Sequence, residues 1–201
     1  MSTGEIISEP TVDPDAPLTW STGAMTAEGF AAVCAEVTSR ERPSVVECGS
    51  GFSTLKLAEL IQQRGGRLVS LEHDETWATR VRSNLAAAGL AETAQVTLAP
   101  LEPHPLARDG LPWYAEHPLR FLFRRIDVLL VDGPPAFEPE TELSRYPALP
   151  ALAERLAPDA IVVLDDIDRR GELRVLEAWE RECDFRFEIQ TAERIAIGRR
   201  S

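Results

Sequence analysis

The segment that most constrains this chain covers residues 44–54 and reads Ser-Val-Val-Glu-Cys-Gly-Ser-Gly-Phe-Ser-Thr. Two β-branched residues lead to an acid, Glu47, and two glycines then enclose one small residue before a helical pattern begins. Gly49 and Gly51 can adopt positive φ angles and have no Cβ, so a ligand can lie directly against the backbone there. We therefore predict a strand, a tight turn and the N-terminus of a helix.

The charges around this turn indicate what it can bind. Backbone N–H groups at the start of a helix favour a negative group, whereas Glu47 at the end of the strand favours a positive one. A zwitterion that carries a sulfonium cation suits both. The same glycines also occur in ordinary strand-to-helix turns, so the motif alone leaves both interpretations open.

The composition limits the class of protein and of partner. The chain has 201 residues, of which 44% are apolar and 27% charged, as is typical of one globular domain. Its net charge of −12 argues against a nucleic acid or an anionic membrane as the main partner, because phosphate binding relies on clustered Lys and Arg. Neither a signal peptide nor an apolar run long enough to span a membrane is evident. We expect a cytoplasmic protein that acts on a small molecule.

The chain begins with a segment that differs from the rest. Residues 1–25 hold several prolines among acidic and small polar residues, which predicts an extended leader or lid. Trp20 in this leader either folds over a site or anchors the leader to the core. Residues 26–201 are expected to form a single domain.

Strand and helix patterns alternate five times along this domain. The expected strands cover residues 44–47, 67–71, 95–98, 126–131 and 160–164, and the helices include 26–41, 76–88, 147–156 and 172–182. This alternation predicts right-handed crossovers and a parallel sheet with helices on both faces. Residues 185–191 and 194–198 lie too close together for a crossover helix, so we expect an antiparallel hairpin. The predicted fold is a Rossmann-like, doubly wound α/β sheet of seven strands, mostly parallel with a C-terminal antiparallel strand.

Acidic residues follow nearly every predicted strand. They are Glu47, Glu72, Asp132, Asp165 and Asp166. In open α/β sheets, ligands bind at the carboxyl ends of the strands, so these acids should share one edge. They would repel one another unless a cation or many donors shared them, although an acid after a strand can also simply cap the next helix.

The position of Glu72 narrows the ligand class. Glu72 follows the second strand at the spacing from the glycines where an acid meets the ribose hydroxyls of an adenosine ligand. A nicotinamide dehydrogenase normally has a third glycine, where this chain has Thr54, and a further substrate domain. A methyl donor fits better.

These residues together resemble those of a class I S-adenosylmethionine-dependent methyltransferase. The resemblance rests on the glycine turn, Glu72, Asp132 and the final antiparallel pair, and it covers about residues 26–198. It implies that the turn holds the methionine part of the cofactor, Glu72 the ribose, and residues after the second and third strands the adenine. The implied cofactor-binding residues are Glu47, Gly49, Ser50, Gly51, Ser53, Thr54, Glu72, His73, Ala99, Pro100 and Asp132.

Within that superfamily, the acids Asp132, Asp165 and Asp166 are similar to those of magnesium-dependent small-molecule O-methyltransferases. In those enzymes such residues bind Mg²⁺, which holds a diol of the substrate and lowers the pKa of its hydroxyl. This chain departs from the catechol type in two ways: Gly-Pro-Pro follows Asp132, and Asp166 stands where that type has Asn. Two alternatives stay open, a bound Mg²⁺ or a contact of Asp132 with the cofactor amine and no metal.

A hydroxyl acceptor also requires a group that accepts its proton. Besides Asp132, the candidates on loops near this edge are His104, His117, Tyr114, Arg145 and Tyr146. Histidine is the commonest proton acceptor near neutral pH, and His117 is preferred because it lies beside Trp113 and Tyr114, which could wall an apolar acceptor. Trp77 and Trp179 are predicted to lie in the core.

The sequence therefore predicts transfer of a methyl group from S-adenosylmethionine to a small acceptor, at a hydroxyl oxygen and with magnesium as a possible second cofactor. Two other interpretations stay open, a non-catalytic S-adenosylmethionine-binding subunit and a nucleotide-dependent oxidoreductase. A homodimer is compatible with the exposed edge that the C-terminal hairpin would present.

Overall fold

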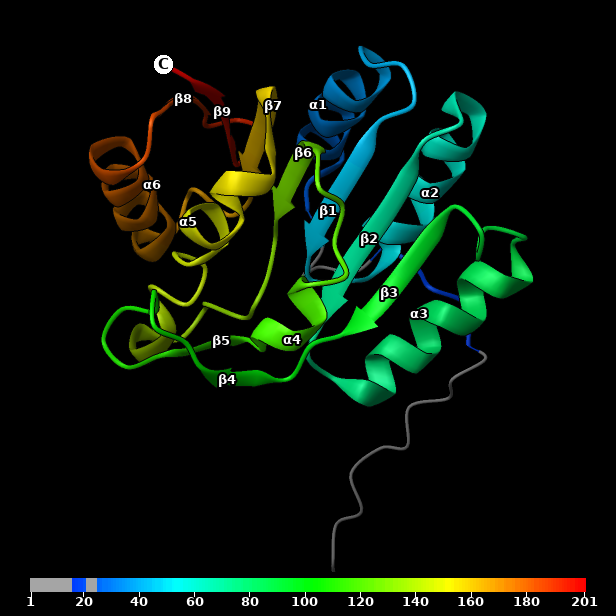
Figure 1. Cartoon of the computed structure of the whole chain (residues 1–201), viewed down its shortest axis with the longest axis horizontal. Helices are drawn as coiled ribbons and strands as arrows, with labels where there is room; N and C mark the ends of the chain where they lie inside the picture. Colours follow the sequence, from blue (N-terminus) through cyan, green and yellow to red (C-terminus); the bar gives the residue numbers. More distant parts are fainter. Residues whose placement is uncertain (1–15, 21–24) are drawn as a thin grey trace, which may run out of the picture.

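The structure is a computed structural model that describes residues 16–20 and 25–201 (Figure 1). Most of the leader expected over residues 1–25 lies outside the described residues. The first helix begins at Ala27, and Thr26 is its N-cap residue: Thr26 Oγ1 accepts a hydrogen bond from the Gly29 N–H at 3.0 Å.

The centre of the fold is a seven-stranded sheet with the strand order β3-β2-β1-β6-β7-β9-β8. Its strands are β1 (Ser44–Cys48), β2 (Arg67–Glu72), β3 (Ala94–Leu98), β6 (Ile126–Val131), β7 (Leu156–Leu164), β8 (Phe185–Gln190) and β9 (Ile195–Arg200). The first five of these pair in parallel, whereas β9 is antiparallel to both of its neighbours, β7 and β8. The predicted sheet, mostly parallel with a C-terminal antiparallel strand, is confirmed.

Helices cover both faces of this sheet (Figure 1). One face carries α1 (Ala27–Thr38), α2 (Phe52–Arg64) and α3 (Glu75–Ala87), and the other carries α4 (Glu116–Leu119), α5 (Ala148–Leu152) and α6 (Arg170–Glu182). Because successive side chains of a strand point to opposite faces, Val45 packs in the core beneath α1–α3 and Val46 in the core beneath α4–α6. None of the described helices is both long and apolar enough to cross a membrane.

Two regions differ from the sequence prediction. Strand β7 already begins at Leu156, so the helix expected over residues 147–156 is reduced to α5 and a 3₁₀ turn, Ala153–Arg155. Leu156 is buried and pairs with Ile126 of β6, so sheet pairing outweighs helix propensity there. The second region, residues 99–125, was not assigned from the sequence. It forms the antiparallel hairpin β4 (Leu101–Pro103) and β5 (Pro112–Tyr114), followed by α4.

The carboxyl ends of the parallel strands meet at one edge of the sheet, with the β4–β5 hairpin running beneath it in Figure 1. At this edge the turns after β1 and β6 touch each other at Gly49 and Gly133. Gly49 has a φ of 89°, in the left-handed region that favours glycine. A Cβ on Gly133 would lie 2.7 Å from Tyr114 Oη and 2.9 Å from the Gly49 backbone nitrogen. The two turns can approach this closely only because both residues are glycines.

We expect Gly133→Ala to lower the free energy of unfolding by about 1–3 kcal/mol, because the added methyl group must displace backbone. Gly51→Ala is the matched control, since Gly51 has an extended φ of 173° and its Cβ would meet no atom nearer than 4.0 Å. Urea unfolding of both variants measures the difference. Equal stability of the two variants would contradict this account of the turn packing.

Candidate functional site

The glycine turn, residues 47–54, is held in place by Glu47. This side chain is fully buried, and its carboxylate oxygens accept hydrogen bonds from Ser53 Oγ and Thr54 Oγ1, each at 2.6 Å. Thr54 Oγ1 accepts a further bond from the Gly51 N–H at 2.8 Å. Burial raises the pKa of Glu47, and the hydroxyl donors partly offset this rise. The hydrogen bonds among Glu47, Ser53 and Thr54 therefore fix the conformation of the turn.

Glu72, at the end of β2, is oriented by donors on both of its oxygens. Its Oε2 accepts from the Ser50 N–H at 3.0 Å and from Ser50 Oγ at 2.8 Å. Its Oε1 accepts from the backbone N–H groups of His73 at 2.7 Å and Asp74 at 3.0 Å. Burial acts to raise the pKa of Glu72, but the His73 side chain, whose Nδ1 lies 2.9 Å from Oε1, and these hydrogen bonds outweigh it and hold the pKa below its ordinary value. Glu72 is therefore a fixed carboxylate at neutral pH.

Glu72 forms part of the wall of a hollow of about 480 Å³ at the carboxyl ends of β1, β2 and β6, here called the central hollow. Gly49, Ser50, His73 and Trp77 line it as well. Trp77, predicted to lie in the core, packs against the core beneath α1–α3 but is only half-buried, and its indole Nε1 donates to the Ser50 carbonyl at 2.7 Å. The α3 helix begins at this edge of the sheet, so the apolar face of its first turn reaches the hollow. Trp179 is fully buried, as predicted.

Tyr114 reaches the central hollow from β5 of the inserted hairpin. Its hydroxyl is buried and has no hydrogen-bond partner among the described residues. Burial raises the pKa of Tyr114 well above its ordinary value, so the phenol keeps its proton. Tyr114 is therefore a hydrogen-bond donor rather than the proton acceptor considered from the sequence. A buried donor without a partner is costly, which makes it available to a bound ligand.

A smaller hollow of about 240 Å³, the side hollow, lies on the other side of Ser50 and Trp77. Gly51, Phe52 and Ser53 of the glycine turn and of α2 line it, and so do Leu18, Thr19 and Met25 from the leader. Trp20 does not line it. Its ring packs edge-on against Phe30 and Phe52, with centroids 5.7 Å and 5.2 Å away, so this leader aromatic rests on the body of the domain.

Asp132, Asp165 and Asp166 come together at the ends of β6 and β7, as the sequence predicts. One carboxylate oxygen from each lies within 4.8 Å of the others, and we call these three residues the acid cluster. Burial raises the pKa of Asp165 to about 6, with the charge of Asp166 as the next cause. Burial likewise raises the pKa of Asp132, against the lowering effect of Arg145. Asp132 lines both hollows, and its side chain is 21% exposed.

A buried arginine occupies the centre of this cluster. The Arg145 side chain is 4% exposed, and its Nη2 lies 3.1 Å from Asp166 Oδ2 and 3.5 Å from Asp132 Oδ1. Burial disfavours its charge, but the surrounding carboxylates outweigh this and raise its pKa. Arg145 therefore donates hydrogen bonds and cannot accept a proton, contrary to its place among the candidate bases. Nothing in the sequence around Arg145 distinguishes it from a surface arginine.

Of the two alternatives that the sequence leaves open, a bound Mg²⁺ does not fit this arrangement. The three acids are close enough to share a cation, but Asp166 already contacts three guanidinium groups: Oδ2 lies 3.1 Å from Arg145 and 2.8 Å from Arg169, and Oδ1 lies 2.8 Å from Arg194. Mg²⁺ requires near-octahedral oxygen ligands and keeps several waters. We therefore assign no chemical step to a metal.

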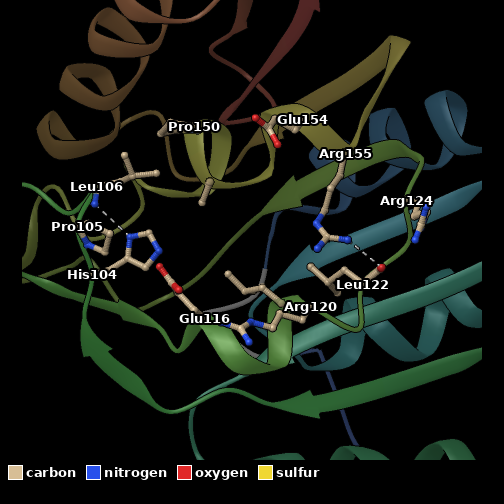
Figure 2. A pocket seen from close by; sticks show the side chains of 12 residues that line it. His104, Pro105, Leu106, Glu116, Arg120, Leu122, Arg124, Pro150, Glu154 and Arg155 are labelled. Carbon is tan, nitrogen blue, oxygen red and sulfur yellow. Dashed lines mark hydrogen bonds between the residues drawn. The ribbon is translucent and has the colours of Figure 1, made fainter.

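Neither His104 nor His117, two of the predicted proton acceptors, lines the central hollow. His104 lines a separate hollow of about 780 Å³ between the β4–β5 hairpin, α4 and α5 (Figure 2), and among the described residues that hollow shares none with the central one. His104 Nδ1 accepts from the Leu106 N–H at 3.3 Å. His117 packs edge-on against Phe121, with centroids 5.3 Å apart. Both histidines therefore lie elsewhere than the sequence predicted, and the histidine that lines the central hollow is His73.

Three other predicted residues have local roles. The Tyr146 hydroxyl donates to Glu182 Oε2 at 2.6 Å, which ties it to α6 rather than to the central hollow. Ala99, expected beside an adenine, is fully buried, and its N–H donates to the Glu72 carbonyl at 2.7 Å. Neither Ala99 nor Pro100 lines the central hollow.

Comparisons with known proteins agree with this geometry. A family model described as a methyltransferase domain matches residues 46–167, which include the glycine turn, Glu72 and the acid cluster. No curated protein sequence matches the chain.

Several solved structures share the fold. The S-adenosylhomocysteine-bound methyltransferase PaMTH1 of Podospora anserina is 12% identical, with a TM-score of 0.69 over 89% of this chain and 80% of that one. An O-methyltransferase from Bacillus cereus in complex with S-adenosylhomocysteine is 19% identical, with a TM-score of 0.64 over 90% and 84%. A precorrin-6y C5,15-methyltransferase from Geobacter metallireducens is 17% identical, with a TM-score of 0.62 over 90% and 85%. At these identities the likeness concerns the fold alone.

The buried carboxyl of Glu172 on α6 should make the stability of the protein depend on pH. Burial raises its pKa to about 7, although Arg145 Nη1 lies 3.5 Å and Arg169 Nη1 3.8 Å away and Asp166 adds to the rise. The folded state keeps a proton that the unfolded state, with a pKa near 4.5, has lost, so Glu172 lowers stability increasingly as the pH rises from 4.5 to 7.

We expect Glu172→Gln to raise the free energy of unfolding by up to about 3 kcal/mol at a pH of about 8 and to change it little at a pH of about 5. Urea unfolding at the two pH values measures this. Glu177→Gln, an exposed position on the same helix, is the control and should show no such dependence. A gain at pH 5 as large as that at pH 8 would contradict the titration.

Proposed function

This chain belongs to the methyltransferase domain family whose model matches residues 46–167, and on that premise we propose that it methylates a hydroxyl oxygen of a small molecule. The chain is an S-adenosylmethionine-dependent methyltransferase, which decides against the nucleotide-dependent oxidoreductase that its sequence left open. The proposal concerns the acceptor and the residues that act on it.

The residues around the central hollow fit the cofactor. Gly51, which lines the adjoining side hollow, leaves open space, since a Cβ there would meet only Trp77, at 4.0 Å. Glu72 presents an oriented carboxylate to pair with hydroxyl groups, and Tyr114 offers a buried hydroxyl without a partner among the described residues. When bound, S-adenosylmethionine supplies a methyl group on a positively charged sulfur. Ser50, Glu72 and Tyr114 would hold it across the ends of β1 and β2.

The observation that carries the proposed acceptor is the position of Asp132. Its carboxylate lies where the central and side hollows meet, and burial raises its pKa, which makes it a stronger proton acceptor than an exposed aspartate. A hydroxyl acceptor must lose its proton as it attacks a methyl group. We propose that Asp132 binds this hydroxyl and accepts the proton.

The wall of the central hollow favours an acceptor with a flat or apolar body. Trp77, Tyr114 and Phe137 line it, and Phe137 is 67% exposed at its rim. Aromatic side chains stack on rings and bury apolar surface. The net charge of −12 makes a nucleic acid an unsuitable acceptor. We therefore propose a small molecule that combines an aromatic or apolar body with a hydroxyl group.

The role of Glu72 is tested by Glu72→Gln, which keeps the shape of the side chain and removes its charge. Hydrogen bonds to a charged group contribute about 1.5–3 kcal/mol, so S-adenosylhomocysteine should bind about tenfold to a hundredfold more weakly. Isothermal titration calorimetry measures the affinity. Glu59→Gln, which removes a surface carboxylate paired with Lys56, is the control. Unchanged affinity of the Glu72 variant would argue against a cofactor contact there.

The role of Asp132 is tested by Asp132→Asn in an assay that follows S-adenosylhomocysteine formation with a panel of phenols and alcohols. We expect turnover to fall about a hundredfold or more, since general base catalysis contributes about 10²–10⁴. Cofactor affinity should change far less, and the wild-type rate should rise with pH as Asp132 loses its proton. A variant that keeps the wild-type rate would exclude Asp132 as the proton acceptor.

A further inference from the structure

The acid cluster concentrates more charge than a fold normally buries. With Glu172 added, four carboxylates lie together here. Asp165, Asp166 and Glu172 are at most 8% exposed, and Asp132 is half-buried. Carboxylates this close repel one another strongly in a region of low dielectric. A cation beside them relieves this repulsion for the acids that are ionised. The structure places the Arg145 guanidinium against the carboxylates of two of the three acids that could hold a metal, Asp132 and Asp166.

The Arg145 guanidinium is positioned as that cation. Its Nη2 donates to the Asp132 carbonyl at 2.8 Å, its Nη1 to the Asp165 carbonyl at 3.3 Å, and its Nε to the Pro134 carbonyl at 3.2 Å. The same group contacts carboxylate oxygens of three of the four acids, Asp132, Asp166 and Glu172, at 3.1–3.5 Å. Each nitrogen of the guanidinium is therefore engaged, and the group joins the ends of β6 and β7 to α6.

The arginines around Asp166 leave little scope for a second cation. Asp166 lies in the left-handed region, with a φ of 61°, so that its carboxylate turns back toward Arg169 and Arg194 as well as Arg145. A divalent ion on Asp166 would lie within a few ångströms of these guanidinium groups and be repelled by them. It would also have to displace charge-assisted hydrogen bonds that are already formed.

We propose that Arg145 takes the place of the divalent cation in this cluster, so that the enzyme binds cofactor and acceptor without Mg²⁺. The inference rests on the proposed function and makes it more specific. Without a metal to chelate two neighbouring oxygens, the acceptor is held by Asp132 and the aromatic wall. A single hydroxyl then suffices, and a vicinal diol is not required.

The first test is a titration of the wild-type protein with Mn²⁺, followed by electron paramagnetic resonance with and without S-adenosylhomocysteine. We expect the signal of free Mn²⁺ to rise in proportion to the metal added, because the chain offers no site that binds one ion. One bound ion per chain that is lost in Asp165→Asn would overturn the proposal. Calorimetry with S-adenosylhomocysteine is a separate readout: absence of binding there would refute the proposed function, whereas the Mn²⁺ result still decides the role of Arg145.

The second test compares Arg145→Met with Arg174→Met. Arg174 lies on α6 and forms an ion pair with Glu142 at 2.8 Å, but its side chain is partly exposed and lies outside the acid cluster. Leaving buried acids without their cation should lower the Tm of Arg145→Met by about 6 °C or more, and added Mg²⁺ should restore part of it. Wild type and Arg174→Met should not respond to Mg²⁺.

Two outcomes of this comparison would overturn the proposal. One is a Tm of wild type that rises with Mg²⁺ as much as that of Arg145→Met. The other is a Tm of Arg145→Met that equals that of Arg174→Met and does not respond to Mg²⁺. If Arg145→Met does not fold, the Mn²⁺ titration of the wild-type protein decides alone.

Discussion

The charge balance between Arg145 and the acids around it is the constraint on which this edge of the sheet depends. Four carboxylates approach one another where β6 and β7 end, and each one alone would be costly to bury. Exchanging such a network for apolar side chains can leave stability unchanged, but removing one partner leaves a buried charge without compensation. Arg145 therefore serves less to add stability than to determine how the two strand ends and α6 lie relative to one another.

The two halves of the site are built in different ways. At the glycine turn, Glu47 and Glu72 are held by neutral donors, hydroxyl and N–H groups such as those of Ser53 and Ser50. In the acid cluster, Asp132 and Asp166 are held by charged donors, the guanidinium group of Arg145 and, for Asp166, those of Arg169 and Arg194 as well. Asp132 belongs to both halves, because it borders the central and side hollows and also contacts Arg145. A group that binds at the glycine turn is thereby brought next to a carboxylate of raised pKa.

The predictions that held are those in which a short pattern has a physical cause. Apolar runs followed by acids correctly placed Glu72 and Asp132 at strand ends, because a strand buried on both faces must stop where polar groups begin. The predictions that failed, in whole or in part, depend on the path of a loop or on where a helix begins. His104 and His117 belong to the insertion 99–125, whose path depends on how its hairpin packs. Trp77 has the spacing of a core residue, but its helix begins at the edge of the sheet.

The sequence by itself determined which segments form the seven-stranded sheet, which of them run parallel, the glycine turn and the gathering of the acids at one edge. These features follow from local periodicity and from the handedness of the crossovers, which hold for any chain with this pattern. Only the tertiary structure decided which cation neutralises the acids and which aromatic side chains wall the hollow. Tyr114 reaches the site from β5, whereas Phe137 and Arg145 reach it from the segment between β6 and α5. Their positions depend on the path of these segments through space rather than on any spacing in the sequence.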